Sequence, residues 1–332
     1  MKKILVVGGA GYIGSQLVLE AEAAGLYPII FDNLSRGHRK AVGQYPLVVG
    51  DLRDAIQIKA CLSEHSVEAV FHFAALAYVG ESVREPSAYY QNNVAGTLNL
   101  LDAMQASGVK QLIFSSTCAT YGEPEYLPIN ESHPQRPINP YGHSKLIIEQ
   151  VLRDMAVAEG LNSVSLRYFN AAGADPQGRT GECHDPETHL LPLVLQEAMR
   201  VKQGGLPEET QLVVHGLDLD TPDGSCVRDY VHVADLCQAH LLALEALQDG
   251  RLHGASAFNL ANHRGYSVLE VIDCCRRVTR QDIRYRAGQR RPGDPGCLIG
   301  QAQAAKELLG WQPLHSDLEI MVQTAWNWMN RK

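Results

Sequence analysis

Residues 1–115 alternate between short apolar runs and longer amphipathic stretches, and this alternation limits the possible folds more than any other feature of the sequence. Five apolar runs have the length of strands: KILVV, YPIIFD, PLVVGD, EAVFHFAA and KQLIFSS. Between them we expect helices over residues 12–24, 53–64 and 87–106. Strands that alternate with helices form a parallel sheet covered on both faces. The sequence therefore predicts an α/β fold, a doubly wound parallel sheet.

The pattern changes near residue 170. A further helix is expected over residues 141–159, and the run NSVSLRYF follows it as a sixth strand. Three loops rich in Gly, Pro and Asp then separate shorter elements, over residues 171–188, 203–210 and 216–229. We predict a first domain over residues 1–170 and a smaller C-terminal domain, mainly over residues 171–332, at the carboxyl edge of the sheet. Part of residues 228–262 is expected to return to the main sheet.

The charge and the N-terminus exclude several classes of protein. The net charge is −8 and the chain has no run rich in Lys and Arg, which argues against nucleic-acid or membrane-surface binding. The apolar run after the first two lysines ends at Val7, which is too short for a signal peptide or a membrane span. Eight cysteines without a C-x-x-C pair indicate reduced thiols. We therefore expect a cytoplasmic protein.

The stretch ECHDPETH places Cys183, His184 and His189 close together, as a metal site could. It lacks a second ligand pair at zinc-finger spacing and contains a proline. We interpret it as a loop and predict no metal.

The first strand leads directly into GGAGYIG, with glycines at Gly8, Gly11 and Gly14. Glycines at such a turn let the backbone approach a pyrophosphate, which binds at the N-terminus of the following helix. The G-x-x-G-x-x-G spacing is a variant of the common dinucleotide fingerprint. Asp32 ends the second strand eighteen residues after Gly14, where an acid would bind the adenosine ribose hydroxyls, unless it only caps a turn. The arrangement predicts NAD in preference to NADP.

Two further strands end in residues that suit a bound cofactor. Asp51 follows the third strand, where its carboxylate could reach the adenine amino group. Phe73, Ala74 and Ala75 end the fourth strand, and the small alanines would let a cofactor pass closely over the sheet. Carboxyl ends of strands are where open α/β sheets bind ligands. Tight helix packing is an alternative explanation for the alanines.

The stretch NPYGHSK places Tyr141 and Lys145 one helical turn apart, on the same face of a helix. Taken alone, a tyrosine and a lysine at this spacing occur in many helices by chance and indicate no function. The fifth strand, however, ends in Ser115, Ser116 and Thr117. A hydroxyl, a phenol and an ammonium group are therefore expected at the sheet edge that holds the dinucleotide.

With these motifs in order, the sequence resembles the extended short-chain dehydrogenase/reductase family, and most closely its nucleotide-sugar 4-epimerases of the UDP-glucose 4-epimerase type. The resemblance covers essentially the whole chain. It rests on these stretches: GGAGYIGS, DNLSRG, GDLRD, HFAALAYVGESV, NNVAGTLNLL, FSSTCATYGEP, NPYGHSKLIIEQ, LRYFNAAGA, PETHLLPLVLQ, DGSCVRDYVHV and RRPGDP. It implies a Rossmann domain and a smaller domain that binds a UDP-sugar.

The resemblance implies that Tyr141 is the general base and that Lys145 lowers its pKa and holds the nicotinamide ribose. A free tyrosine titrates near 10, and a nearby ammonium and the positive nicotinamide ring would favour the phenolate. Thr117 would hydrogen-bond the sugar hydroxyl and relay the proton. Hydride would leave carbon 4 of the sugar for NAD and return to the opposite face, so NAD should remain tightly bound.

The residues after the threonine separate related reactions. Dehydratases of the family carry Asp-Glu there and decarboxylating relatives carry Ser-Glu, whereas this chain has Cys118 and Ala119. We therefore expect simple 4-epimerisation, of UDP-glucose and UDP-galactose and by extension of the N-acetylated pair. A UDP-pentose 4-epimerase is one alternative. A non-catalytic NAD-binding sensor is another, disfavoured because both Tyr141 and Lys145 are present.

The resemblance also implies the binding residues. Those expected at the cofactor are Gly8, Gly11, Tyr12, Ile13, Gly14, Asp32, Asn33, Leu34, Ser35, Asp51, Leu52, Phe73, Ala74, Ala75, Asn93, Ser115, Tyr141, Lys145 and Phe169. Those expected at the substrate are Thr117, Asn170, His189, Leu190, Val213, His215, Arg228, Arg291, Asp294 and Leu298. The sequence departs from some relatives at Ala77, where they have lysine, and at His189, where they have asparagine.

Within the substrate set, Asn170 and the backbone near His189 and Leu190 would contact the diphosphate and sugar. Arg228 and Arg291 would clamp phosphates, for which a guanidinium fork is suited.

Asp294 would bind the uridine ribose, and Leu298, four residues later, would border the 2-substituent of the sugar. Where relatives have tyrosine there the pocket is narrow, so leucine predicts a wider one that admits an N-acetyl group. The helices over residues 87–106 and 141–159 are apolar on more than one face, and the resemblance implies a homodimer through them. Burial beneath the second domain is the alternative.

Overall fold

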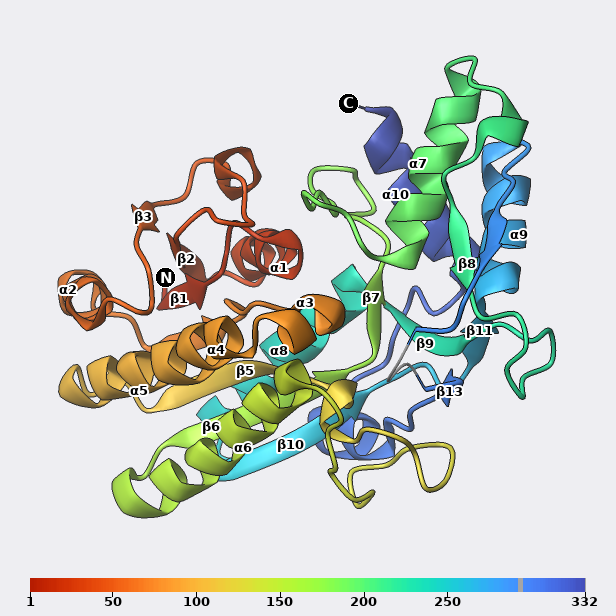
Figure 1. The fold of residues 1–332 in the computed structure, drawn as a ribbon. Coiled ribbons are helices and arrows are strands. Elements are labelled where there is room, and N and C mark those ends of the chain that lie inside the picture. Colours follow the sequence, from red (N-terminus) through yellow and green to blue (C-terminus); the bar gives the residue numbers. More distant parts are fainter. Residues whose placement is uncertain (292–294, 332) are drawn as a thin grey trace.

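Seven parallel strands form the larger sheet of the computed structural model, which describes residues 1–291 and 295–331 (Figure 1). Their order across the sheet is β10-β6-β5-β4-β1-β2-β3. The strands are β1 (Lys3–Val7), β2 (Tyr27–Asp32), β3 (Leu47–Val49), β4 (Ala69–His72), β5 (Gln111–Thr117), β6 (Asn162–Tyr168) and β10 (Ala255–Leu260). The order reverses between β1 and β4, which makes a crevice for ligands at the carboxyl ends of these two strands. The predicted doubly wound α/β class is confirmed.

Helices cover both faces of this sheet because its strands are apolar on both faces. On β1, Ile4 and Val6 pack in one buried cluster, and Leu5 and Val7 pack in another on the opposite face. The first cluster includes side chains of α1 (Tyr12–Ala23) and α8 (Val233–Gln248). The second includes side chains of α2 (Ala55–His65), α5 (Gly96–Ala106) and α6 (Pro140–Glu159).

A smaller group of elements lies beyond the carboxyl ends of the large sheet (Figure 1). Its strand β9 pairs with β7, β11 and β13, and β8 pairs with β12. Three helices surround a third buried cluster that includes Leu195, Ile272 and Met321. The elements are β7 (Asn170–Ala172), α7 (Leu190–Lys202), β8 (Val213–His215), β9 (Val227–His232), β11 (Gly265–Ser267), α9 (Val268–Thr279), β12 (Arg286–Gly288), β13 (Cys297–Leu298) and α10 (Leu318–Asn330).

The chain passes between the two groups of elements more than once. Strand β9 belongs to the small sheet, whereas α8 and β10 pack on or join the large one. The segment with Ala302 and Trp311 also returns to the large core, where the Trp311 indole donates to the Asp235 carbonyl at 2.9 Å. The sequence did not predict this second return, because a short segment has too few residues to show a period.

The helix expected over residues 87–106 consists of three consecutive pieces. They are α4 (Pro86–Tyr89), a π-helix η2 (Tyr90–Ala95) and α5. The π-helix contains Asn93, whose side-chain oxygen accepts from the Leu76 amide at 2.9 Å and whose nitrogen donates to the Ser144 hydroxyl at 3.0 Å. Single wide turns of this kind often occur at functional sites. One regular helix was therefore a wrong expectation, since a π turn leaves no signal in the apolar spacing.

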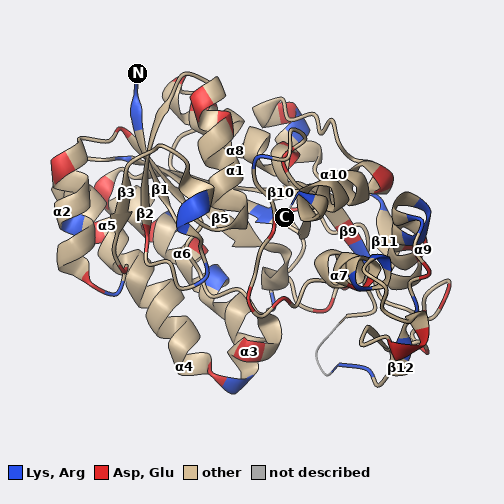
Figure 2. Cartoon of the chain, turned by 90° about the horizontal axis from the view of Figure 1, so that it is seen from above, with Lys and Arg blue, Asp and Glu red and all other residues tan. Residues whose placement is uncertain are grey.

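The remaining short helices are α3 (Val79–Arg84), η1 (Arg39–Val42), η3 (Cys118–Thr120), η4 (Pro207–Glu209) and η5 (Ala305–Leu309). Figure 2 shows Lys and Arg interspersed with Asp and Glu over the outer helices. In the part of the chain that the structure describes, no helix has the length and apolar character to cross a membrane.

Candidate active site

The glycine turn lies between β1 and α1, at the point where the strand order reverses. Gly8 has φ +83°, and a Cβ built on it would lie 2.5 Å from the Ala74 nitrogen. A Cβ on Gly14 would lie 2.2 Å from the Gly8 carbonyl oxygen. Internal packing therefore requires glycine at both positions, and it brings the end of β4 directly over the turn.

Gly11 has a different reason to be glycine. It caps the N-terminus of α1 without a side-chain hydrogen bond, and a Cβ built there would meet the Gly8 oxygen at 3.4 Å, an ordinary contact. The protein itself leaves room at Gly11, beside the free amides of the helix start. This room fits the pyrophosphate of a dinucleotide, which such a helix terminus binds through its amides and dipole.

Asp32 is the last residue of β2, and Asp51 lies just after β3. The Asp32 carboxylate is buried and accepts from the amides of Ala10 at 3.0 Å and Leu34 at 2.8 Å. Burial raises the pKa of Asp32, although these two amides oppose the shift. Asp32 thus does cap a turn, and its role at the ribose stays a prediction.

The Asp51 carboxylate accepts from Arg53 at 2.7 Å and from the Asn33 amide at 3.0 Å. The hydrogen bond from Arg53 holds the pKa of Asp51 well below its usual range. Asp51 is therefore ionised and held at the sheet edge, and its contact with adenine stays a prediction.

Tyr141 and Lys145 are positioned by the first turns of α6. Asn139 caps this helix by accepting from the Gly142 amide at 2.8 Å, and Pro140 occupies the first helical position. Lys145, 2% exposed, donates to the Ser115 carbonyl at 2.8 Å. Its ammonium lies 6.0 Å from the centre of the Tyr141 ring. The structure therefore brings the phenol, the ammonium and the end of β5 together.

The expected lowering of the phenol pKa is not seen in the protein alone. Burial raises the pKa of Tyr141 to about 12, although a hydrogen bond with Thr117 opposes the shift. Burial also lowers the pKa of Lys145 to about 7, although the charge of Glu149 opposes that change. Loss of water disfavours both charged forms. A positive charge on a bound group, such as an oxidised nicotinamide ring, would stabilise the phenolate.

A buried ion pair beneath the site was missed by the sequence analysis. The Glu149 carboxylate accepts from Arg167 at 2.6 and 2.9 Å and from the Ser116 hydroxyl at 2.5 Å. Arg167 also donates to the Tyr121 hydroxyl at 2.9 Å. Glu149 follows Lys145 by four residues, so its place on the same helix face was the available signal.

The end of β4 is fixed by main-chain hydrogen bonds. The amides of Phe73 and Ala74 donate to the Val7 carbonyl at 2.8 and 3.0 Å. Ala74 also packs closely over Gly8. Tight packing is therefore one reason for the alanines at the end of β4.

The other residues expected at the cofactor follow the carboxyl ends of the same strands. Tyr12 begins α1, and its hydroxyl donates to the Gly173 carbonyl at 2.6 Å, which links α1 to the small group of elements. The rest occur at or just after β1, β2, β3, β4, β5 and β6, and comprise Ile13, Asn33, Leu34, Ser35, Leu52, Ala75, Ser115 and Phe169.

On the substrate side, Leu298 lies near the end of β5. It packs against a buried cluster that includes Cys118 and Phe169, next to Thr117 in the chain. In the small sheet Leu298 stands opposite Arg228, and Asn170 stands opposite Tyr230. This arrangement places Leu298 beside the end of β5.

The other substrate candidates are more dispersed. Leu190 begins α7, and His189 precedes it with its side chain beside Glu182 and Glu187. Val213 and His215 lie in β8, and Arg291 is exposed. Asp294 lies outside the described residues.

Comparison with known proteins decides the family. The family model described as "NAD dependent epimerase/dehydratase family" matches residues 4–261. The chain belongs to this family. This match confirms the resemblance stated from the sequence. It also confirms the prediction of NAD as the cofactor.

Individual members of the family are similar over nearly the whole length. A curated "UDP-glucose 4-epimerase" of Rhizobium meliloti is 47% identical over 330 residues, which are 99% of this chain and 97% of that protein. The crystal structure of UDP-glucose 4-epimerase from Brucella ovis in complex with NAD is 46% identical, covers 98% of each chain and has a TM-score of 0.92. The enzyme from Bifidobacterium longum in complex with NAD⁺ and UDP is 37% identical, covers 100% of this chain and 99% of its own, and also has a TM-score of 0.92.

Proposed function

We propose that this protein catalyses the NAD-dependent 4-epimerisation of a UDP-sugar, the interconversion of UDP-glucose and UDP-galactose. The observation that carries the proposal is the group formed by Tyr141, Lys145 and Thr117. This group lies at the carboxyl edge of the large sheet, where the glycine turn also lies. The similarity to proteins named UDP-glucose 4-epimerase, over 98–99% of this chain, supports it.

The side chains of the protein would transfer the proton and orient the sugar and the cofactor. Bound NAD supplies the acceptor and donor for a hydride at carbon 4 of the sugar. Tyr141 takes the proton from the 4-hydroxyl and later returns it, while Thr117 hydrogen-bonds the same oxygens. Lys145 would hold the nicotinamide ribose, and Lys145 and Thr117 are buried while Tyr141 is half-buried, which limits the access of water to the exchange.

Cys118 and Ala119 limit the reaction to epimerisation. Alanine carries no titratable group, and burial raises the pKa of Cys118 to about 12. Neither side chain can move a proton at carbon 5 or carbon 6 near neutral pH. Loss of water or of carbon dioxide from the sugar therefore lacks a general acid or base at this position.

The UDP part is proposed to bind along the small sheet and the start of α7. Arg228 and Arg291 would pair with phosphate oxygens, and the Leu190 amide at the helix start would donate to the diphosphate. Asn170 would contact the sugar.

The proposed activity is tested by incubating the purified protein, without added NAD, with a panel of UDP-sugars that includes the pentoses. We expect UDP-galactose and UDP-glucose to interconvert. Turnover of the pentoses alone would favour a UDP-pentose 4-epimerase. Bound NAD without turnover of any sugar would favour a non-catalytic sensor.

We expect Asp32→Ala to weaken NAD retention by about 10- to 150-fold, the effect of losing a charged hydrogen bond of about 1.5–3 kcal/mol. It should also relax discrimination against NADP, because the carboxylate that repels a 2′-phosphate is gone. Denaturing the purified protein and quantifying released nucleotide measures retention. Asp32→Asn, which keeps one acceptor for the turn, is the control for local folding. Purified wild type that releases no nucleotide would contradict a tightly held NAD.

We expect Leu298→Tyr to lower kcat/KM for UDP-GlcNAc relative to UDP-glucose by about 5- to 150-fold. The larger ring would fill the space for the N-acetyl group, and such overpacking costs about 1–3 kcal/mol. Leu298→Met keeps the volume and is the matched control. An unchanged ratio in Leu298→Tyr, or a wild type inactive on UDP-GlcNAc, would show that Leu298 does not set the width of the pocket.

We further propose a homodimer through α5 and α6. Leu98 on α5 and Ile147 on α6 are 42% and 40% exposed, so burial beneath the second domain does not account for their apolar character. Light scattering coupled to size exclusion measures the oligomeric state.

A cytoplasmic location and the domain division at residue 170 also stay proposals. All eight cysteines are free thiols, as is typical of a reducing compartment.

A further inference from the structure

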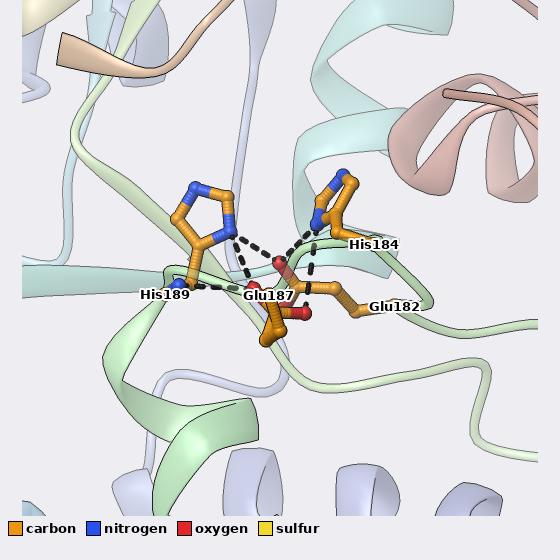
Figure 3. Close-up of side chains that lie close together, drawn as sticks. All are labelled: Glu182, His184, Glu187 and His189. Carbon is orange, nitrogen blue, oxygen red and sulfur yellow. Dashed lines mark hydrogen bonds and ion pairs between the residues drawn. The ribbon is translucent and has the colours of Figure 1, made fainter. Parts of the chain in front are cut away.

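Four side chains with metal-ligating atoms gather in the loop between β7 and α7 (Figure 3). We name them the Glu–His cluster: Glu182, His184, Glu187 and His189. One ligand atom from each lies within 4.8 Å of all the others. The ring of His184 lies 6.4 Å from that of Tyr12, which follows the glycine turn, and the proposed reaction gives the four side chains of the cluster no chemical task.

We propose that the Glu–His cluster binds one divalent transition-metal ion of the zinc class. Zinc sites in proteins are commonly tetrahedral, with nitrogen and oxygen ligands about 2.0–2.2 Å from the ion. Two ligands of such a site lie about 3.4 Å apart, because of the tetrahedral angle. The proposal can therefore be compared directly with the nitrogen–oxygen separations in the cluster.

The four separations are distributed around this value, from 2.6 to 3.7 Å. His184 Nδ1 lies 3.0 Å from a Glu182 oxygen and 3.7 Å from a Glu187 oxygen. His189 Nδ1 lies 2.6 and 3.3 Å from oxygens of the same two glutamates. Both Nδ1 atoms are buried, and among the described residues neither finds a hydrogen-bond partner of good geometry. Each nitrogen faces two carboxylates at once, so the four groups converge on a common point.

The charge and the donor types indicate which ion fits. Two carboxylates carry two negative charges, which a dication would neutralise while the imidazoles remain neutral ligands. Imidazole nitrogen favours zinc and neighbouring transition metals, whereas magnesium and calcium prefer sites made entirely of oxygen. The Glu187 carboxylate is also held in place by the amides of Thr188 and His189, at 2.8 and 2.9 Å. Such support is typical of ligating carboxylates.

From the sequence we predicted no metal here, because the stretch lacks a second ligand pair at zinc-finger spacing and contains a proline. Cys183, in the middle of the loop, is exposed and lies outside the cluster. Glu182 at the start of the stretch and Glu187 within it complete the ligand set, and they became recognisable only when the loop brought all four side chains together.

A metal here would fix the loop against the cofactor side of the protein. The carbonyls of Cys183, Asp185 and Pro186 accept from His38 at 2.6 Å, Arg36 at 3.0 Å and Tyr78 at 3.2 Å. The loop leads directly into Leu190 at the start of α7. The ion would therefore have a structural role, holding the segment that joins the two groups of elements.

The test is calorimetric titration of chelator-treated full-length protein with Zn²⁺. We expect one ion per chain, with Mg²⁺ failing to compete. Glu182→Gln and Glu187→Gln keep the side-chain shape and should each weaken Zn²⁺ binding by at least about 100-fold. Loss of a residue that only hydrogen-bonds a metal ligand costs at most about this factor. Cys183→Ser is the matched control and should bind as the wild type does. Circular dichroism melting of each variant checks that it is folded.

A second measurement locates the ion. Crystals soaked in Zn²⁺ should give one anomalous peak between the four side chains. No binding by the folded wild type, unchanged binding in both glutamine variants, or loss of binding in Cys183→Ser would each overturn the proposal. The cluster would then be a set of His–Glu ion pairs only.

Discussion

Replacing Tyr141 by phenylalanine is expected to lower kcat by about 10²- to 10⁴-fold, the usual contribution of a general acid–base group. The substitution removes the phenol oxygen and keeps the ring. NAD content and UDP binding should therefore remain near the wild-type values. Steady-state kinetics with UDP-galactose, together with nucleotide release on denaturation, measures both effects.

Tyr126→Phe is the matched control for this prediction. Tyr126 is 43% exposed, and its hydroxyl contacts Asn130 at 3.1 Å. Its loss should leave kcat unchanged. If Tyr141→Phe kept most of the activity, Tyr141 would not be the base.

Replacing Arg167 by leucine is expected to lower the free energy of unfolding by about 3–5 kcal/mol, because a buried carboxylate loses its counterion. The pair is almost fully buried, with 5% of the Arg167 side chain and 1% of the Glu149 side chain exposed. Urea denaturation monitored by circular dichroism measures the difference from the wild type.

The double variant Glu149→Met with Arg167→Leu separates the charge from the packing. It leaves no unpaired carboxylate and should be more stable than Arg167→Leu alone. In the single variant Glu149 would keep only the more distant and exposed Arg153, 4.0 Å away, and would have a raised pKa. The destabilising effect of this carboxylate should be complete at pH values well above the raised pKa, shrink as the pH falls through it, and vanish below the ordinary pKa of glutamate. Equal stabilities of the single and double variants at neutral pH would refute this explanation.

The parts of the site that follow single strands could be predicted from the sequence. Gly8 directly follows β1, Gly14 lies in the first turn of α1 and Asp32 ends β2, and parallel strands bring their carboxyl ends to one edge whatever the packing details. Tyr141 and Lys145 share a helix face because of their spacing alone. Such local rules need no knowledge of the rest of the fold.

The parts that depend on contacts distant in sequence could not be predicted. Glu149 meets Arg167 from a neighbouring strand, and Trp311 returns to a core formed mostly before residue 261. The pKa of Tyr141 depends on how completely the site excludes water, which composition does not reveal. The Glu–His cluster depends on the path of one irregular loop.

The central claim is that hydride leaves and returns to the same carbon without leaving the protein. The most direct measurement is turnover of UDP-galactose deuterated at carbon 4, by purified protein without added NAD, followed by NMR of the product. The account predicts UDP-glucose that retains the deuterium at carbon 4. Product in which that deuterium is replaced by solvent hydrogen, or the absence of product from protein shown to contain NAD, would contradict it.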